Sequence, residues 1–304
     1  MIAYAVIMVG RRKVINHQNK KKYRSVTSHG GLACHASVPC GVCENKDVDS
    51  VNWRFATWKN VAIALFNLFL PRACAGCDTP DYILCDNCKK ALQCWKRAPF
   101  TRTVCGYRYA CGSYSTVVRR SILLWKDHFD IACDKIFGEL IGDLVVEVIS
   151  KFLRSHSCYI SENPIFVIPV PSSKYSSRHR GRKHMLPVAN CVAKRLCNSG
   201  IRAYVLDIVS MNARITAKSV QTSGFRGRSN RISKAFSIDF KELRKQKSEN
   251  QREYKAIVLD DIVTTGSTMN SCVSTLQSSG ITVLACFSLA CVCNKDDRTA
   301  DYEC

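Results

Sequence analysis

The chain has 304 residues, of which 46% are hydrophobic and 23% charged, a globular composition that excludes disorder for most of its length. Its formal net charge of +21 favours polyanionic ligands, either a pyrophosphorylated sugar or nucleic acid. The 19 cysteines lack the pattern of a small secreted disulfide scaffold, so a reducing compartment fits best. The longest apolar run, Val61 to Leu70, is about half a membrane span. We therefore expect a soluble, cytoplasmic protein.

The first hundred residues divide into a tail and a small module. Residues 1–52 are rich in Lys and Arg and show little periodicity, which predicts a basic, disordered tail. A single Cys-x-x-Cys pair in it, Cys40 and Cys43, cannot complete a tetrahedral metal site. Residues 53–100 are expected to form a helix that ends at Pro71 and then a cysteine-rich module.

That module holds two Cys-x-x-Cys knuckles separated by seven residues. The four cysteines are Cys74, Cys77, Cys85 and Cys88. Four thiolates at this spacing can close tetrahedrally around Zn²⁺, and such a site leaves no position for water, so the metal would be structural. The alternative is four free or oxidised cysteines.

Residues 101–160 are predicted to be a helical cover, because apolar residues recur every three or four positions over 114–125 and 131–152. Lys126 follows the first of these helices, where it could face the functional site or solvent. Residues 161–294 are predicted to form the main domain. It opens with an apolar strand, Pro164 to Val170, of the kind buried on both faces of a parallel sheet.

This strand leads into a loop that holds Ser172, Ser173 and Lys174. Its hydroxyls, amides and cation form a candidate anion site at the carboxyl end of a strand, where open α/β sheets bind ligands. A helix is expected over residues 185–197 and a strand over 202–209. The basic stretch that follows suits a lid over a charged ligand, or simply a solvated loop. Its candidate residues are Gln221, Arg226, Arg228 and Asn230.

The most informative stretch is Ala256 to Ser271. Four apolar residues, 256–259, predict a buried strand that ends on Asp260 and Asp261. A hydroxyl-rich turn comes next, and then a helix, so free amide groups and the helix dipole would favour an anion. The turn consists of Thr264, Thr265, Gly266, Ser267 and Thr268. The alternative is an ordinary buried strand followed by a capped helix. Another apolar strand is predicted at 282–290, and residues 295–304 form a polar tail.

Together these motifs resemble the ComF family, from about Phe55 to Val292. The resemblance implies a type I phosphoribosyltransferase fold, a parallel twisted sheet flanked by helices, with a small N-terminal zinc-ribbon and helical module. It also implies phosphoribosyl pyrophosphate bound with Mg²⁺. Asp260 and Asp261 would hold the ribose, Thr264 to Thr268 the 5-phosphate, and Ser172 to Lys174 the pyrophosphate. One departure is that Arg182, Lys183 and His184 stand where the family usually has Phe-Asn-Gln.

Two functions follow as expectations. The first is transfer of the phosphoribosyl group to an acceptor, although neither the acceptor nor a catalytic base can be named from the sequence. The alternative, also implied by the family, is a non-catalytic, ligand-responsive protein that handles single-stranded DNA in natural transformation, with a competence protein as partner.

Overall fold

The computed structural model describes residues 72–156, 163–212, 235–245 and 253–292, all of which lie in one compact unit. The statements below concern these residues. The predicted basic tail, the helix before Pro71 and the C-terminal tail lie outside them. So do the four candidate lid residues, Gln221, Arg226, Arg228 and Asn230.

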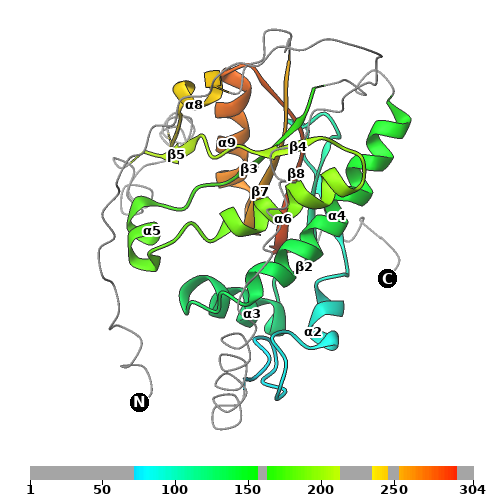
Figure 1. The fold of residues 1–304 in the computed structure, drawn as a ribbon, viewed down its shortest axis with the longest axis vertical. Helices are drawn as coiled ribbons and strands as arrows, with labels where there is room; N and C mark the ends of the chain where they lie inside the picture. The colour runs from blue at the N-terminus through cyan, green and yellow to red at the C-terminus, as the bar shows by residue number, and fades with distance from the viewer. Residues whose placement is uncertain (1–71, 157–162, 213–234, 246–252, 293–304) are drawn as a thin grey trace, which may run out of the picture. The chain divides into compact units, whose positions relative to one another are not determined.

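The core of the fold is a six-stranded sheet in the order β1-β2-β8-β7-β3-β4 (Figure 1). The strands are β1 (Lys96–Pro99), β2 (Tyr107–Ser113), β8 (Ile281–Cys291), β7 (Tyr254–Val263), β3 (Ile165–Pro169) and β4 (Ala203–Val205). Neighbouring strands are parallel, except that β1 is antiparallel to β2. A separate antiparallel pair consists of β5 (Val209–Met211) and β6 (Phe236–Ile238). The expected α/β class with a mostly parallel sheet is confirmed.

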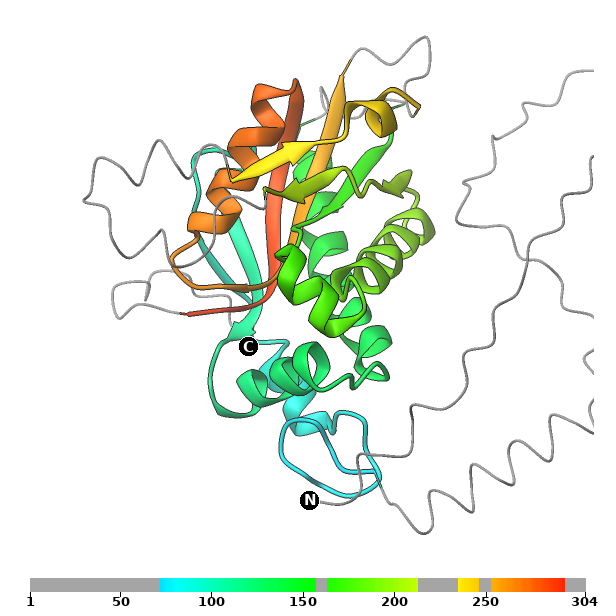
Figure 2. The same ribbon diagram turned by 90° about the vertical axis from the view of Figure 1, so that its left-hand side faces the viewer.

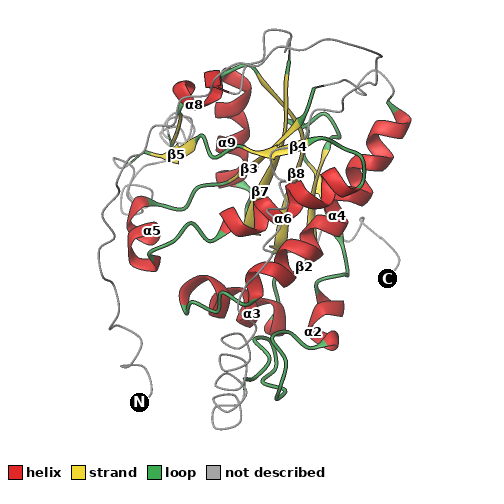
Figure 3. Ribbon diagram, in the orientation of Figure 1, coloured by secondary structure: helices red, strands yellow, loops and turns green. Residues whose placement is uncertain are grey.

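Helices cover both faces of this sheet (Figures 2 and 3). They are α2 (Asp86–Ala91), α3 (Thr116–Asp127), α4 (Cys133–Ser155), α5 (Lys174–Arg180), α6 (Met185–Asn198), α8 (Phe240–Lys245) and α9 (Ser267–Ser278). Side chains alternate along β7: Ile257 and Leu259 join the core formed with α4 and α6, whereas Ala256 and Val258 join the core formed with α9. Within the described ranges, no helix combines the length and apolar character needed to cross a bilayer.

Several elements differ from the prediction. Strands β1 and β2 were not expected, because their sequences carry Lys96, Arg97 and Arg108 and lack an apolar run. The strand predicted over 202–209 is interrupted: β4 ends at Val205 and the next strand, β5, belongs to the second sheet. Strand β7 continues to Val263, so the two aspartates lie within the strand rather than after it.

The topology brings the two predicted anion loops together. Strands β3 and β7 are parallel neighbours whose register pairs Pro169 with Leu259, so both strands end at the same edge of the sheet. The Ser172 loop follows β3, and the Thr264–Thr268 loop follows β7. Ligands of open α/β sheets bind at this edge.

Candidate functional site

The loop after β7 is open to solvent. Thr264, Thr265, Ser267 and Thr268 are exposed, and α9 begins at Ser267. Gly266 precedes the helix with φ +76°, a left-handed conformation that glycine adopts at little cost. The Thr265 and Ser267 hydroxyls lie 2.8 Å apart, and the helix start has no side-chain cap. The Ser267 amide donates to Oγ1 of Thr265, at 3.4 Å, while the next amides of the first turn are directed at the loop, where they could bind an anion.

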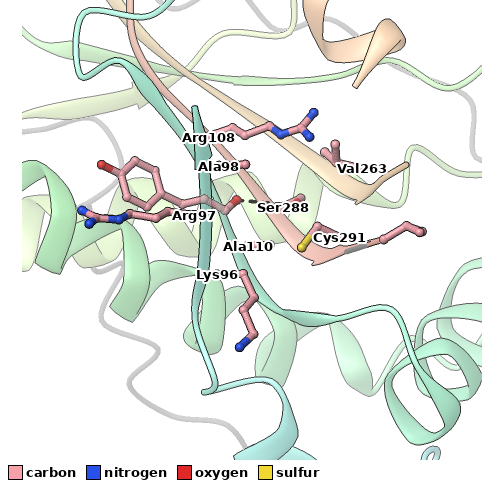
Figure 4. Close-up of a pocket in the computed structure, with 10 residues that line it drawn as sticks. Lys96, Arg97, Ala98, Arg108, Ala110, Val263, Ser288 and Cys291 are labelled. Atoms are coloured by element: carbon pink, nitrogen blue, oxygen red, sulfur yellow. Dashed lines mark hydrogen bonds between the residues drawn. The ribbon is translucent and has the colours of Figure 1, made fainter. Parts of the chain in front are cut away.

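Arg108 of β2 reaches this loop from a distant part of the sequence. A Cβ built on Gly266 would lie 2.0 Å from Nη1 of Arg108, so the guanidinium and the glycine backbone are in close contact. Figure 4 shows the Arg108 side chain extending toward the side on which Val263 lies, where both residues line a small pocket. Arg108 forms no ion pair with any described residue. It is a phosphate-binding candidate that the sequence did not reveal.

The two aspartates are buried and face opposite layers. Asp260 is 8% exposed and Asp261 6% exposed. Asp260 lies on the α9 side, where its charge helps to raise the pKa of Cys272. Asp261 lies on the other side, in contact with α3 and with the start of α6. The pair therefore does not form one bidentate surface.

Asp261 is the centre of a buried polar network. Its Oδ2 forms an ion pair with Lys126 at the end of α3 and lies 2.7 Å from Nε2 of His184. Its Oδ1 accepts a hydrogen bond from the Ile262 amide, at 2.7 Å. Lys126 thus faces the site rather than solvent. Burial alone would raise the pKa of Asp261, but His184 and Lys126 outweigh it and hold that pKa well below its usual range.

The network continues into the loop after β3. Nδ1 of His184 lies 3.5 Å from the Ser172 hydroxyl and 3.5 Å from Nη1 of Arg180, which itself donates to Ser172 at 3.3 Å. Because a guanidinium can only donate, Nδ1 is the acceptor and Nε2 carries the proton given to Asp261. His184 therefore links the predicted ribose-binding acid to the predicted pyrophosphate-binding loop.

Ser173 and Lys174 have a structural position in the same loop. The Ser173 side chain accepts a hydrogen bond from the Ser176 amide, at 3.0 Å, and caps α5, which begins at Lys174. The sequence predicted a continuous loop here and missed this short helix. Of the residues assigned to the pyrophosphate, Ser172 lines a cavity of about 320 Å³.

Arg182 and His184 connect the start of α6 with α3 and α4. Arg182 donates to both oxygens of Asp134, at 2.9 and 2.8 Å, and Trp125 Nε1 donates to Asp134 at 2.5 Å. The Trp125 ring also packs edge-on against His184, with centroids 5.0 Å apart. Arg182 and His184 thus join the contacts around Trp125 and Asp261, whereas Lys183 forms an ion pair with Asp207.

The pKa of Asp260 is shifted in the opposite direction from that of Asp261. Burial, reinforced by the negative charge of Asp261, raises the pKa of Asp260 to about 8. Its Oδ1 accepts the Asp261 amide at 2.8 Å. At neutral pH the ligand-free protein therefore holds Asp260 largely in the neutral form, which can donate as well as accept a hydrogen bond.

This shift predicts a pH-dependent effect of Asp260→Asn. Because the folded chain binds the proton more tightly than the unfolded chain, the stability contributed at low pH is lost as pH rises from about 4 to 8. The asparagine side chain in the variant does not titrate, so the variant has no such loss. The free energy of unfolding of the variant, relative to that of wild type, should therefore rise by more than about 1.4 kcal/mol between pH 5 and pH 8. Urea denaturation at the two pH values measures this. A difference between the proteins that does not change with pH would contradict the assignment.

The four cysteines of the module come together as predicted. Their sulfur atoms all lie within 4.8 Å of one another. Zn–S bonds of about 2.3 Å place the sulfurs of a tetrahedral site about 3.8 Å apart, so the cluster can close around Zn²⁺ with little adjustment. Cys74, Cys85 and Cys88 are buried, which limits access of water to the metal position.

The backbone around the cluster is also suited to thiolates. The amides of Gly76 and Cys85 donate to Sγ of Cys74, at 3.4 and 3.2 Å. Burial opposes ionisation of Cys74, but these donors outweigh it and lower the pKa of the thiol. A hydrogen bond from Thr79 lowers the pKa of Cys77 to about 6. Burial and the neighbouring cysteines raise the pKa of Cys88, so the surroundings favour the thiolate form of Cys74 and Cys77 but not of Cys88 before a metal binds.

The part of the chain that the structure describes holds no comparable site for magnesium. Among the described residues, the cysteine cluster is the one group of three or more potential ligands that is close enough to hold a metal ion. Asp260 and Asp261 are buried on opposite sides, so they do not form a set of oxygen ligands for Mg²⁺. A magnesium ion would have to arrive on the oxygens of a phosphorylated ligand.

No protein-family model matches the chain, and no curated protein matches it.

Proposed function

We propose that the chain binds phosphoribosyl pyrophosphate through a type I phosphoribosyltransferase fold of the ComF kind. One observation carries the proposal: an exposed, hydroxyl-rich helix start follows two buried aspartates on β7, beside the loop of the parallel neighbour β3. The close approach of Arg108 to Gly266 supports it, because a phosphate in the loop would meet a cation as well as amides.

In this proposal each group has a distinct role. The amides and hydroxyls of Thr264 to Thr268, with Arg108, hold the 5-phosphate. Because Asp260 and Asp261 face opposite layers, one of them accepts hydrogen bonds from ribose hydroxyls, using lone pairs left by its present partners. Ser172 contacts the pyrophosphate. Magnesium, bound to the ligand, would neutralise part of its charge.

Transfer of the phosphoribosyl group is the enzymatic form of the proposal. Bond breaking at the anomeric carbon places charge on the sugar and the leaving pyrophosphate, and Lys126 and Arg180 lie within the network that surrounds them. Pyrophosphate release in the presence of candidate acceptors measures turnover. Binding without release, combined with salt-dependent affinity for single-stranded DNA, would instead favour the non-catalytic function.

The binding step itself is tested by calorimetric titration with phosphoribosyl pyrophosphate and Mg²⁺. We expect Gly266→Ala to weaken binding at least tenfold, which is about 1.4 kcal/mol. The new methyl group would displace the flexible Arg108 guanidinium from the loop, at a residue with φ +76°, so the phosphate would lose this cation.

Gly280→Ala is the matched control. Gly280 follows α9 with φ +81°, but nothing lies within 4 Å of its added Cβ. It therefore carries a similar backbone cost of about 1–2 kcal/mol without touching the loop. Equal affinities for the two variants, or wild-type protein that does not bind the ligand, would refute the assigned phosphate site.

A further inference from the structure

A pocket of about 320 Å³ lies beside the Ser172 loop. Its walls come from the end of β3, from α5, from the start of α6, and from β5 with the segment that precedes it. No residue of the Thr264–Thr268 loop lines it, so it is separate from the proposed 5-phosphate site. Its volume is in the range of pockets that hold a small organic molecule.

The walls of the pocket are largely apolar. They include Val170, Met185, Leu186, Val209 and Met211. Pyrophosphate would leave many of its oxygens facing these side chains without a donor, which is costly. A flat ring, in contrast, gains van der Waals contact on each side. The apolar walls therefore favour an apolar group over pyrophosphate, and an aromatic or heteroaromatic ring fits this volume.

Charged groups at the pocket carry a positive excess. Lys183 and Arg178 line it together with one acid, Asp207. Lys183 Nζ lies 2.5 Å from Asp207 Oδ2, so this acid is already neutralised. Arg178 is exposed and forms no ion pair with any described residue. Its guanidinium can bind a carboxylate in bidentate fashion.

The polar end of the pocket is rigid. Ser172 and His184 line it, and His184 is 2% exposed. Asp261 and Arg180 fix the two ring nitrogens of His184, as described above, and Arg180 also donates to Ser172. A ligand in the pocket would thus contact the Ser172 hydroxyl, which Arg180 and His184 already hold in position.

We propose that this pocket is a second ligand site, specific for an aromatic or heteroaromatic carboxylate, with its ring on the apolar walls and its carboxylate on Arg178. The site shares Ser172 with the proposed pyrophosphate position, but its other lining residues have no part in that proposal, so it goes beyond the proposed sugar-phosphate function. Benzoate is a suitable probe, and benzamide is its neutral counterpart.

Ligand-observed NMR titration of the full chain tests the proposal. Benzoate should bind at millimolar concentration and at least fivefold more tightly than benzamide, because one exposed charge-assisted contact is worth about 1 kcal/mol. Arg178→Gln should remove this preference and leave benzamide unaffected. No benzoate binding, or equal binding of the two probes by the wild-type chain, would overturn the proposal.

Substitution of two serines on neighbouring strands tests where benzoate binds. Ser210 lines the pocket and pairs with Ser237 across β5 and β6, whereas Ser237 does not line it. Ser210→Phe should fill the pocket and abolish benzoate binding, while Ser237→Phe should leave it intact. Benzoate binding that survives Ser210→Phe would also overturn it. Titration with phosphoribosyl pyrophosphate is read separately, so failure of one site is distinguishable from failure of the other.

Discussion

Replacement of Cys85 by serine is expected to abolish metal binding and to unfold the four-cysteine module. Zn²⁺ contributes on the order of 10 kcal/mol to the folding of small zinc peptides, and these four sulfurs already lie within 4.8 Å of one another. Metal analysis should find about one zinc per wild-type chain and almost none in Cys85→Ser. Hydrogen exchange over residues 72–95 should rise strongly in the variant, as it should after chelation of wild-type protein.

Cys94→Ser is the matched control for this prediction. Cys94 follows the second knuckle, is half-buried and does not belong to the cluster. Its replacement should leave the zinc content unchanged. Wild-type chain that contains no metal after expression with zinc, or equal loss of zinc in the two variants, would contradict a four-cysteine site.

Loss of the Asp261 charge should have the second large effect. Asp261→Asn would leave the Lys126 ammonium without its carboxylate in a largely buried position, where removal of one partner of an ion pair costs about 3–5 kcal/mol. We expect a decrease of about 3 kcal/mol in the free energy of unfolding, measured with urea. Binding of phosphoribosyl pyrophosphate should be lost as well.

The double variant Asp261→Asn, Lys126→Met separates the two roles of the aspartate. Removal of the unpaired ammonium should restore most of the stability, because no uncompensated charge remains at this contact. It should not restore ligand binding, since the carboxylate is still missing. Restored binding would assign Asp261 a structural role only. If Asp261→Asn alone lowered the stability by less than about 1 kcal/mol, the Lys126 contact would carry little energy.

The sequence was most informative where strands are buried on both faces. Runs such as Ile165 to Ile168 and Ala256 to Leu259 have no polar face, which identifies central parallel strands without further information. The cysteine spacing likewise predicted the cluster, because four ligands close in sequence need little from the rest of the fold. The glycine- and threonine-rich loop was recognisable for the same reason.

Contacts between residues that are far apart in the sequence could not be predicted from local patterns. Arg108 lies on a strand that is placed by its pairing with β8, and His184 meets Asp261 across 77 positions of sequence. Nothing local distinguishes Arg108 from a surface arginine, or His184 from a residue that ends a basic loop. The opposite orientation of Asp260 and Asp261 was in principle predictable, because adjacent side chains alternate once both belong to one strand. It was missed because the strand was expected to end before them.

A crystal structure with bound phosphoribosyl pyrophosphate and Mg²⁺ would test the proposed site most directly. We predict that the 5-phosphate lies within hydrogen-bond distance of the backbone amides of residues 265–268 and of the Arg108 guanidinium, with ribose hydroxyls at Asp260 or Asp261. Ligand bound away from this loop, with the amides and Arg108 left uncontacted, would contradict the assignment.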